Sequence, residues 1–412
     1  MIRFINQPIL REGMKFLRRK LKNGMTIVME KRESNVVSVG ISNPYGGGYD
    51  DYKVKGIAHF IEHLLFTGTK TRTHEDISRE IEKRGGILNA GTYNELTIYQ
   101  FKLPSEHLFI GLDILTDMLK NSIFEKGKFE KEKRVIFEEI KMNHDVPTRH
   151  IWKLIETNLF EGPFGDSNLG TFETLSAMKR DFVKEYFEEM YNPGNFIVSI
   201  VGNANFNEVC DYFEENFKPG NKRIAEPKVI RINKESVEER EGIDQAHFIF
   251  AVHCPSPRSR EFLALQILDA YLGRGMSSRL FLEIREKRGL AYAVQSAIDS
   301  ERNGPYYAIY VGTTKDKVEE VKEVILDEFK KIKLEMDEKD LEEAKEMLIG
   351  LRDVESEESN NTMIELVFEE LLGNAESYYE FEEKVRGIKL EEVKELAEKL
   401  IKNYSTASVV PK

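Results

Sequence analysis

Short hydrophobic runs beside turn residues recur along the whole chain. The runs at residues 25–29 and 36–41 adjoin the turn signals Asn23-Gly24 and Asn43-Pro44, which is typical of strands. Between residues 89 and 103, β-forming residues alternate with polar ones and predict a strand pair, or one strand with its continuation. The same pattern predicts later strands at residues 196–201, 247–252, 306–311 and 407–410.

Helical spacing of apolar residues fills most of the remaining chain. It dominates up to about residue 190 and returns from about residue 261, where long charged helices are expected. Strands and helices do not alternate regularly, as they would in βαβ units. We therefore expect an α+β fold, with helices layered against a sheet.

The two halves of the chain share the same order of predicted elements. Between them, residues 216–228 combine two prolines, a glycine and several charges, a composition typical of a linker. The tetrapeptide EKRG at residues 82–85 recurs 204 residues later, at 286–289. With 412 residues, too many for one hydrophobic core, the chain is predicted to contain a duplication. We expect a first repeat at residues 1–215, a linker at 216–235 and a second repeat at 236–412.

A short predicted helix near residue 60 has two differently used faces. On a helical wheel, His59, Glu62 and His63 cluster opposite the apolar residues. Histidines at positions i and i+4 can offer nitrogens to one metal ion, and a zinc peptidase needs a carboxylate beside the attacking water. The alternative is a solvated polar face, and a zinc site would require a third protein ligand.

A second predicted helix, at residues 129–143, offers candidates for that third ligand. Glu132 and Glu139 fall within its broad apolar side, which includes Val135, whereas Glu138 points toward the solvent side. Buried carboxylates require a compensating cation, which can be a metal or a basic side chain. The wheel therefore favours Glu139 over Glu138, and it leaves pairing with basic side chains open.

Composition excludes several classes of protein. The net charge of −12 argues against nucleic acid as a partner, and no segment has the length of apolar sequence that a membrane span needs. The N-terminus lacks the pattern of a signal peptide, so we expect a mature cytoplasmic protein. Cys210 and Cys254 have no CxxC companion and are expected to be buried, reduced thiols.

Three stretches of the first half resemble the N-terminal signature of the pitrilysin-type zinc peptidases with an inverted HxxEH motif: GIAHFIEHLLFTGTKTR, RGGILNAGTYNELTIY and EKEKRVIFEEI. That family includes insulin-degrading enzyme and the mitochondrial processing peptidase. GPFGDSNLG, YNPGNFIVSIVGN and SSRLFLEIREKRGLAYAV extend the resemblance over most of the chain. It implies two homologous repeats, each a mixed and mostly antiparallel sheet packed with helices, forming half of a clam-shell.

The resemblance also implies roles for individual residues. One zinc ion per chain would be held by His59, His63 and Glu139, with Glu62 as the general base. Glu132 matches an additional acidic position near the metal.

Other implied contributions come from outside the metal motif. Asn89 and Ala90 match an edge strand to which an extended peptide substrate adds as another strand. Arg285 and Tyr292 match an arginine and tyrosine that the family's second half places at the active site. Arg288 is a local rival, and either arginine could instead be an exposed charge at a helix end.

The second half is not expected to hold a metal at the corresponding position. The offset of 204 residues places Leu263, Gln266 and Ile267 opposite His59, Glu62 and His63. Six further histidines have no ligand-spaced partner and are expected to be surface or core residues: His74, His107, His144, His150, His247 and His253. The glycine run at residues 46–48 is predicted to be a loop.

The function expected from these features is zinc-dependent hydrolysis of unfolded peptides or small polypeptides inside a closed chamber. In the short-chain branch of the family two such chains form the chamber, so a homodimer is expected. Two alternatives are a non-catalytic scaffold subunit and a partner-dependent half of a heteromeric peptidase. Scaffold subunits typically lose the metal residues, and heteromeric peptidases carry the metal motif on one chain and the arginine-tyrosine pair on the other. This chain carries both sets.

Overall fold

The computed structural model describes residues 15–220 and 224–412, which form two compact units. The first unit contains the described residues up to Ile140, together with Ser167–Pro227 and Glu355–Glu380. The second unit contains Lys141–Asp166, Lys228–Val354 and Phe381–Lys412. None of the helices in the described ranges combines the length and apolar character that crossing a membrane would require.

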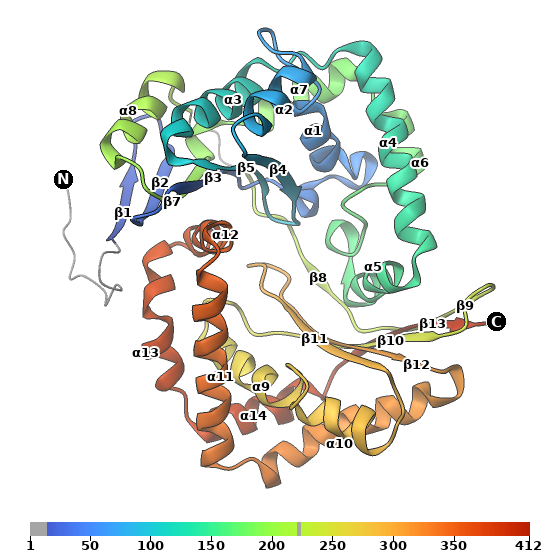
Figure 1. Ribbon diagram of the computed structural model, residues 1–412. Coiled ribbons are helices and arrows are strands. Elements are labelled where there is room, and N and C mark those ends of the chain that lie inside the picture. The colour runs from blue at the N-terminus through green and yellow to red at the C-terminus, as the bar shows by residue number, and fades with distance from the viewer. Residues whose placement is uncertain (1–14, 221–223) are drawn as a thin grey trace. The chain divides into compact units, whose positions relative to one another are not determined.

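The first unit is built on a six-stranded sheet in which only β2 and β7 run parallel. One face packs against helices, and β4 forms one edge, beside the candidate metal helix (Figure 1). In spatial order the strands are β1 (Lys15–Lys20), β2 (Thr26–Lys31), β7 (Ile197–Gly202), β3 (Val36–Asn43), β5 (Thr97–Pro104) and β4 (Ile87–Thr92). The helices are α1 (Ile57–Leu65), α2 (His74–Glu82), α3 (Leu108–Asn121), α4 (Lys126–Asp145), α6 (Phe172–Ala177), α7 (Arg180–Met190), α8 (Phe206–Asn216) and α12 (Ser359–Leu371).

The second unit repeats this sheet with one strand fewer. Its order from the parallel pair outward is β9, β13, β10, β12 and β11, and only β9 and β13 are parallel. This matches β2, β7, β3, β5 and β4, so the expected α+β fold with two homologous repeats is confirmed. The strands are β9 (Glu235–Arg240), β13 (Ser405–Pro411), β10 (Ala246–His253), β12 (Tyr306–Thr313) and β11 (Ala293–Asp299), with a small ladder of β6 (Phe160–Glu161) and β8 (Ile230–Arg231).

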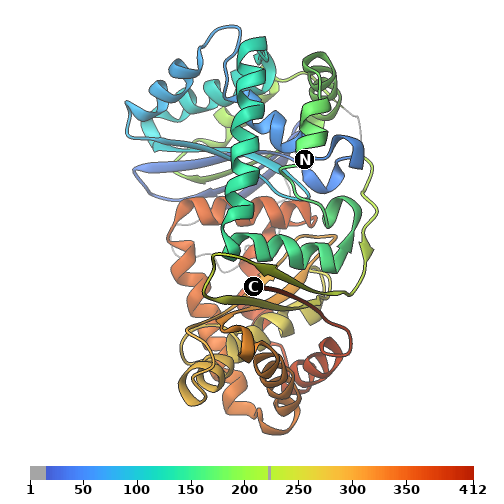
Figure 2. The same cartoon turned by 90° about the vertical axis from the view of Figure 1, so that its right-hand side faces the viewer.

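Helices of the second repeat cover one face of this second sheet. They are α9 (Arg260–Leu272), a π-helical segment (Phe281–Lys287), α10 (Val318–Glu335), α11 (Glu338–Ser356), α13 (Phe381–Arg386) and α14 (Leu390–Leu400). The other face is covered by α5 (Pro147–Leu159), green in Figure 2. This arrangement places the apolar core between the sheet and its helices on both faces.

Each sheet is covered on its second face by a helix from the other half of the sequence. α5 packs Ile151 and Ile155 on β10 and β13 of the second unit. Reciprocally, α12 packs Met363 and Leu366 on β3 and β7 of the first unit. The contiguous ranges expected for the two repeats therefore differ from the packing units, because these two helices are exchanged.

The strands predicted from the sequence are all found. Three strands of the two large sheets are not predicted, namely β1, β9 and β11, and neither is the short ladder of β6 and β8. Within the described residues, the chain between α8 and β8 forms neither helix nor strand. The glycine run at residues 46–48 lies in the connection between β3 and α1, where Gly47–Tyr49 form a 3-10 turn. Cys210 and Cys254 are buried free thiols, as expected.

Candidate metal centre

The helix α1 presents its candidate site residues on one side and its apolar residues on the other. Ile57, Phe60, Ile61, Leu64 and Leu65 are fully buried in the core of the first unit, while His59, Glu62 and His63 are partly exposed. The wheel derived from the sequence is therefore confirmed for this helix.

A buried carboxylate fixes the start of α1. Asp50 accepts hydrogen bonds from the Gly56 amide and from the Tyr45 hydroxyl, each at 2.8 Å. Burial raises the pKa of Asp50 to about 6, while Lys55, the Tyr45 hydroxyl and the first amides of the helix oppose this rise. Gly56 has a positive φ of 96°, a conformation that glycine adopts without strain. The sequence motif thus includes residues that position the helix as well as residues that form the candidate centre.

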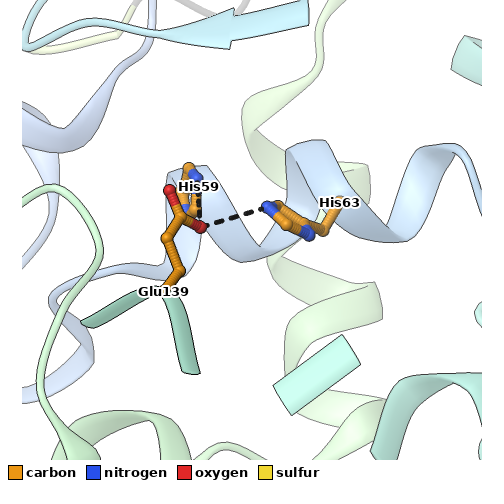
Figure 3. A group of neighbouring side chains, drawn as sticks. All are labelled: His59, His63 and Glu139. Atoms are coloured by element: carbon orange, nitrogen blue, oxygen red, sulfur yellow. Dashed lines mark ion pairs between the residues drawn. The ribbon is translucent and has the colours of Figure 1, made fainter. Parts of the chain in front are cut away.

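Three donor atoms converge at the exposed side of α1 (Figure 3). Glu139 Oε2 of α4 lies 3.8 Å from Nε2 of both His59 and His63. These separations are too long for hydrogen bonds. Two ligands of one tetrahedral zinc ion lie about 3.4 Å apart, since each bond is about 2.0–2.2 Å long. The spacing and the donor types therefore fit a single zinc ion held by His59, His63 and Glu139.

The two imidazoles differ in their affinity for protons. Burial, and to a lesser degree the neighbouring His63, lower the pKa of His59 to about 3, so its ring is neutral and can donate a lone pair. His59 Nδ1 is buried and has no hydrogen-bond partner. Burial also lowers the pKa of His63, but the hydrogen bond to Glu132 and the charges of Glu62, Glu139 and Glu132 outweigh burial and raise it.

Glu132 lies behind His63 in the arrangement expected of a supporting carboxylate. Its Oε2 is 3.4 Å from His63 Nδ1, on the side of the ring opposite Nε2. Such a partner fixes the orientation and tautomer of a ligating histidine. Glu132 and Glu139 therefore both face histidines, and neither forms an ion pair with a lysine or arginine within the part of the chain that the structure describes. Val135 differs from its expected place on the apolar side, since 42% of it is exposed.

Thr92 is a site residue that the sequence analysis does not identify. Its hydroxyl donates a hydrogen bond of 2.5 Å to Glu62 Oε2 from the end of β4. Burial raises the pKa of Glu62 and the Glu139 charge adds to this, whereas Thr92 and His63 lower it. The net direction is upward, which suits a group that must accept a proton and release it again. In the sequence, the only indication that Thr92 belongs to the site is its place three residues after Asn89, within the stretch RGGILNAGTYNELTIY that resembles the family.

Asn89 and Ala90 lie on β4, which among the described strands pairs with β5 on one side only. Ala90 packs toward the core, and Asn89 is exposed. The outer edge of this strand has the open backbone that pairing with an extended peptide requires.

A cavity of about 240 Å³ adjoins the candidate centre. Glu62 and His63 line it, with Phe66 and Thr67 from the end of α1 and Lys128 from α4. Its volume would accommodate one side chain of a bound peptide.

Arg285 and Tyr292 belong to the second unit, and their roles at the metal stay predictions. The Arg285 guanidinium lies 4.8 Å from the centre of the Phe281 ring within the π-helical segment. Tyr292 is half exposed and lies over Gly312 of β12, where any side chain would collide with its ring. Arg288 lies 3.8 Å from Glu283.

The helix α9 carries no metal-binding set at the positions opposite those of α1. Leu263 and Ile267 contribute to the core of the second unit, and Gln266 is partly buried. His247 contacts Tyr310, His253 contacts a main-chain oxygen and His74 contacts the Phe66 carbonyl, in agreement with structural roles.

Comparison with protein families matches both halves of the chain. The family described as "Insulinase (Peptidase family M16)" matches residues 26–171, and the one described as "Peptidase M16 inactive domain" matches residues 177–348. The first range contains the candidate centre. The second contains α9, which lacks a counterpart of that centre, together with α7, β7 and α8 of the first unit.

Curated relatives and solved structures give the same result. "Uncharacterized zinc protease YmxG" of Bacillus subtilis (strain 168) is 30% identical over 400 residues, which are 95% of this chain and 97% of that protein. An "Uncharacterized zinc protease" of Rickettsia bellii (strain RML369-C) is 33% identical over 79% of this chain and 80% of that protein. The crystal structure of a protease from Helicobacter pylori has a TM-score of 0.90 at 20% identity, covering 97% of this chain and 100% of that one. At this identity the structural likeness shows the fold alone.

Proposed function

The chain belongs to the insulinase family, peptidase family M16, and on this premise we propose that it is a zinc-dependent endopeptidase that cleaves unfolded peptides or small polypeptides in a closed chamber. The observation that carries the proposal is the convergence of His59, His63 and Glu139, in which the glutamate lies 3.8 Å from each histidine, beside the carboxylate of Glu62.

The chemistry divides between the ion and the protein. Zinc, when bound, supplies Lewis-acid activation of the attacking water and of the scissile carbonyl. Glu62 accepts the proton of that water and returns it to the leaving amine, and its raised pKa suits both transfers. Thr92 holds one oxygen of Glu62, which leaves the other free to take the proton. Glu132 keeps the His63 ring oriented toward the centre.

Substrate binding and charge stabilisation are assigned to two other places. An extended peptide adds to the open edge of β4 at Asn89 and Ala90, which favours unfolded substrates because folded chains have no free backbone to pair. Arg285 and Tyr292 stabilise the negative charge that develops on the carbonyl oxygen. The exposure of about half of Tyr292 supports this role, since a buried phenol could not reach a substrate.

Two alternative functions of the same fold are less well supported. A non-catalytic scaffold has no use for two histidines and a glutamate arranged around one point, and these are retained here. A partner-dependent subunit would lack either the metal motif or the arginine-tyrosine pair, and this chain has both. We propose a cytoplasmic homodimer, with the buried free thiols of Cys210 and Cys254 in agreement with a reducing compartment. Active enzyme at the 47.7 kDa mass of the monomer in gel filtration would contradict the dimer.

The decisive experiment compares the wild type with Glu62→Gln for zinc content and for cleavage of a quenched, unstructured peptide. We expect about one zinc per chain in both proteins and a loss of cleavage of about 10²–10⁴-fold in the variant, the typical contribution of a general base. Glu75→Gln, at an exposed position on α2, is the control and should change neither quantity. Zinc without cleavage in the wild type would favour the partner-dependent subunit, and no zinc after reconstitution would favour the scaffold.

A further inference from the structure

A second group of metal-binding side chains lies in the second unit. His144 and His150, which have no ligand-spaced partner along the sequence, meet Glu238 in the fold. His144 lies near the end of α4, His150 lies in the first turns of α5, and Glu238 lies on β9. We propose that these three residues form a second site for a divalent transition-metal ion, independent of the proposed peptidase function.

The geometry brings one donor atom of each residue within reach of a single ion. The three donor atoms lie within 4.8 Å of one another. His150 Nε2 is 2.8 Å from Glu238 Oε2, and the two imidazole rings are 4.8 Å apart between centres. His150 is largely buried, whereas 61% of the His144 side chain is exposed. An ion would therefore enter from solvent on the His144 side and complete its coordination with water.

The local backbone explains why the histidines meet. α4 ends at Asp145, and α5 begins at Pro147, so a single residue, Val146, separates the two helices. The His150 amide donates to the Val146 carbonyl, which places its ring in the first turns of α5, beside the end of α4. Histidines six positions apart would not share a face within one continuous helix, and the break at this corner brings them together.

The donor set selects the class of ion. Two imidazoles and one carboxylate suit Zn²⁺, Co²⁺, Ni²⁺ or Cu²⁺, whereas Ca²⁺ and Mg²⁺ prefer oxygen ligands throughout. The same three residue types form the candidate centre on α1 and α4. Although burial raises the pKa of Glu238, hydrogen bonds from His150 and Arg240 lower it overall, so the carboxylate is charged at neutral pH.

The positive charge of Arg240 opposes a cation here, and its contacts show which atoms remain available to an ion. Its guanidinium donates to Glu238 Oε1 at 2.6 Å and to the His144 carbonyl at 2.5 Å. It also lies 3.5 Å from His144 Nε2. Oε2 of Glu238 is left for the ion, which would replace the hydrogen bond to His150. Arg240 would then orient the carboxylate from behind while its charge weakens binding.

Without a metal, His144, His150 and Glu238 would interact only through ion pairs and hydrogen bonds. The two possibilities differ in the number of metal ions that each chain binds. The test uses Co²⁺ as a spectroscopic probe on the full-length chain. His63→Ala removes a ligand of the first centre, so any remaining bound Co²⁺ reports on the second. We expect about two Co²⁺ per wild-type chain and about one in His63→Ala. The double variant His63→Ala/His144→Ala should bind at least tenfold more weakly, as loss of one of three ligands implies.

Two comparisons keep the result independent of folding defects. His144 is mostly exposed, so its removal leaves the packing intact, and His63→Ala/His107→Ala removes a histidine outside the cluster as the matched control. Added Co²⁺ should raise the unfolding temperature of His63→Ala and of the control but not of the His144 double variant. If His63→Ala binds no Co²⁺, or if removing His144 leaves binding unchanged, the cluster is an ion-pair network and the proposal fails.

Discussion

Glu62 and Thr92 form the closest contact in the candidate centre, and this contact makes a pH-dependent prediction. The Thr92 hydroxyl stabilises the charged carboxylate, so Thr92→Val should raise the pKa of Glu62 further. The base acts only when ionised, and its activity is lost as the pH falls through its pKa. The acid limb of kcat/KM should therefore move to higher pH, with cleavage near pH 6 falling about tenfold more than near pH 8, as expected for one charge-assisted hydrogen bond.

A pH–rate profile of Thr92→Val, with Thr157→Val in an exposed helical turn as control, checks this expectation. A loss of equal size at every pH would show that Thr92 acts on substrate binding or folding and not on the base.

Glu132 gives a second prediction, which concerns the affinity for zinc and not the protonation of Glu62. Its contact with His63 Nδ1 orients the ring, so Glu132→Ala should weaken zinc binding about 10–100-fold. Competition with a chelating dye measures this affinity. Glu138→Ala on the exposed side of the same helix is the matched control and should bind zinc like the wild type. Unchanged affinity in Glu132→Ala would remove Glu132 from the metal centre.

Individual residues differ in how well the sequence predicts them. Helical spacing places His59, Glu62, His63 and Glu139 correctly, because one helix face buries apolar side chains and leaves the other for polar ones. Thr92 has no such spacing, since its partner comes from a helix 30 residues earlier in the chain. The meeting of His144 and His150 depends on a helix break, which a wheel for one continuous helix cannot represent.

Among the elements, α1 depends on the capping of its first turn by Asp50. Asn has one acceptor oxygen where Asp50 has two, so it cannot accept from the Gly56 amide and the Tyr45 hydroxyl with separate oxygens as Asp50 does. If the oxygen stays on the Tyr45 hydroxyl, the NH₂ group faces the Gly56 amide, which can only donate. Asp50→Asn should therefore lower the free energy of unfolding by about 1–3 kcal/mol, the cost of an unsatisfied buried polar group. Chemical denaturation measures the change.

Asp51→Asn is the control for this prediction, because Asp51 is exposed and caps only a short turn through the Lys53 amide. If both variants lost the same free energy of unfolding, the hydrogen bonds of Asp50 at the start of α1 would stabilise the fold no more than the turn capped by Asp51.

The position of a strand within its sheet explains why some strands are not predicted from the sequence. β1, β9 and β11 each lie at an edge, and β1 and β9 expose every second or third side chain. Edge strands need few apolar residues, because one side has no neighbouring strand. Central strands such as β7 and β12 are buried throughout and form the continuous apolar runs visible in the sequence.

At the scale of the whole molecule, the exchanged helices make the two halves of the chain interdependent. Dividing the chain after Gly220 separates α12 from the first sheet and α5 from the second. α12 places Met363, Leu366 and Val367 on the first sheet, where they are fully buried. Burying each of these side chains contributes about 1.5–3 kcal/mol to the free energy of unfolding. Losing all of them would therefore remove about 5–9 kcal/mol, which is comparable with the total stability of a domain.

We therefore expect fragments 1–220 and 221–412 to be unfolded alone and to form a folded 1:1 complex when mixed. Circular dichroism and limited proteolysis of each fragment and of the mixture measure this. A peptide of residues 355–380 should partly restore the first fragment, whereas the same peptide with Met363 and Leu366 replaced by serine should not. Cooperative unfolding of fragment 1–220 alone would contradict the expectation.

The exchange of α5 and α12 also has an evolutionary consequence. After a duplication, one copy of a gene segment can usually decay once its chemistry is redundant. Here the second copy can lose its metal-binding residues on α9 without harm, but deleting it would strip the first copy of the helix that shields its sheet. The two copies are thus free to diverge in chemistry while the packing of α5 and α12 keeps them in one chain, so a repeat without a metal-binding set on α9 persists beside the repeat that carries the candidate centre.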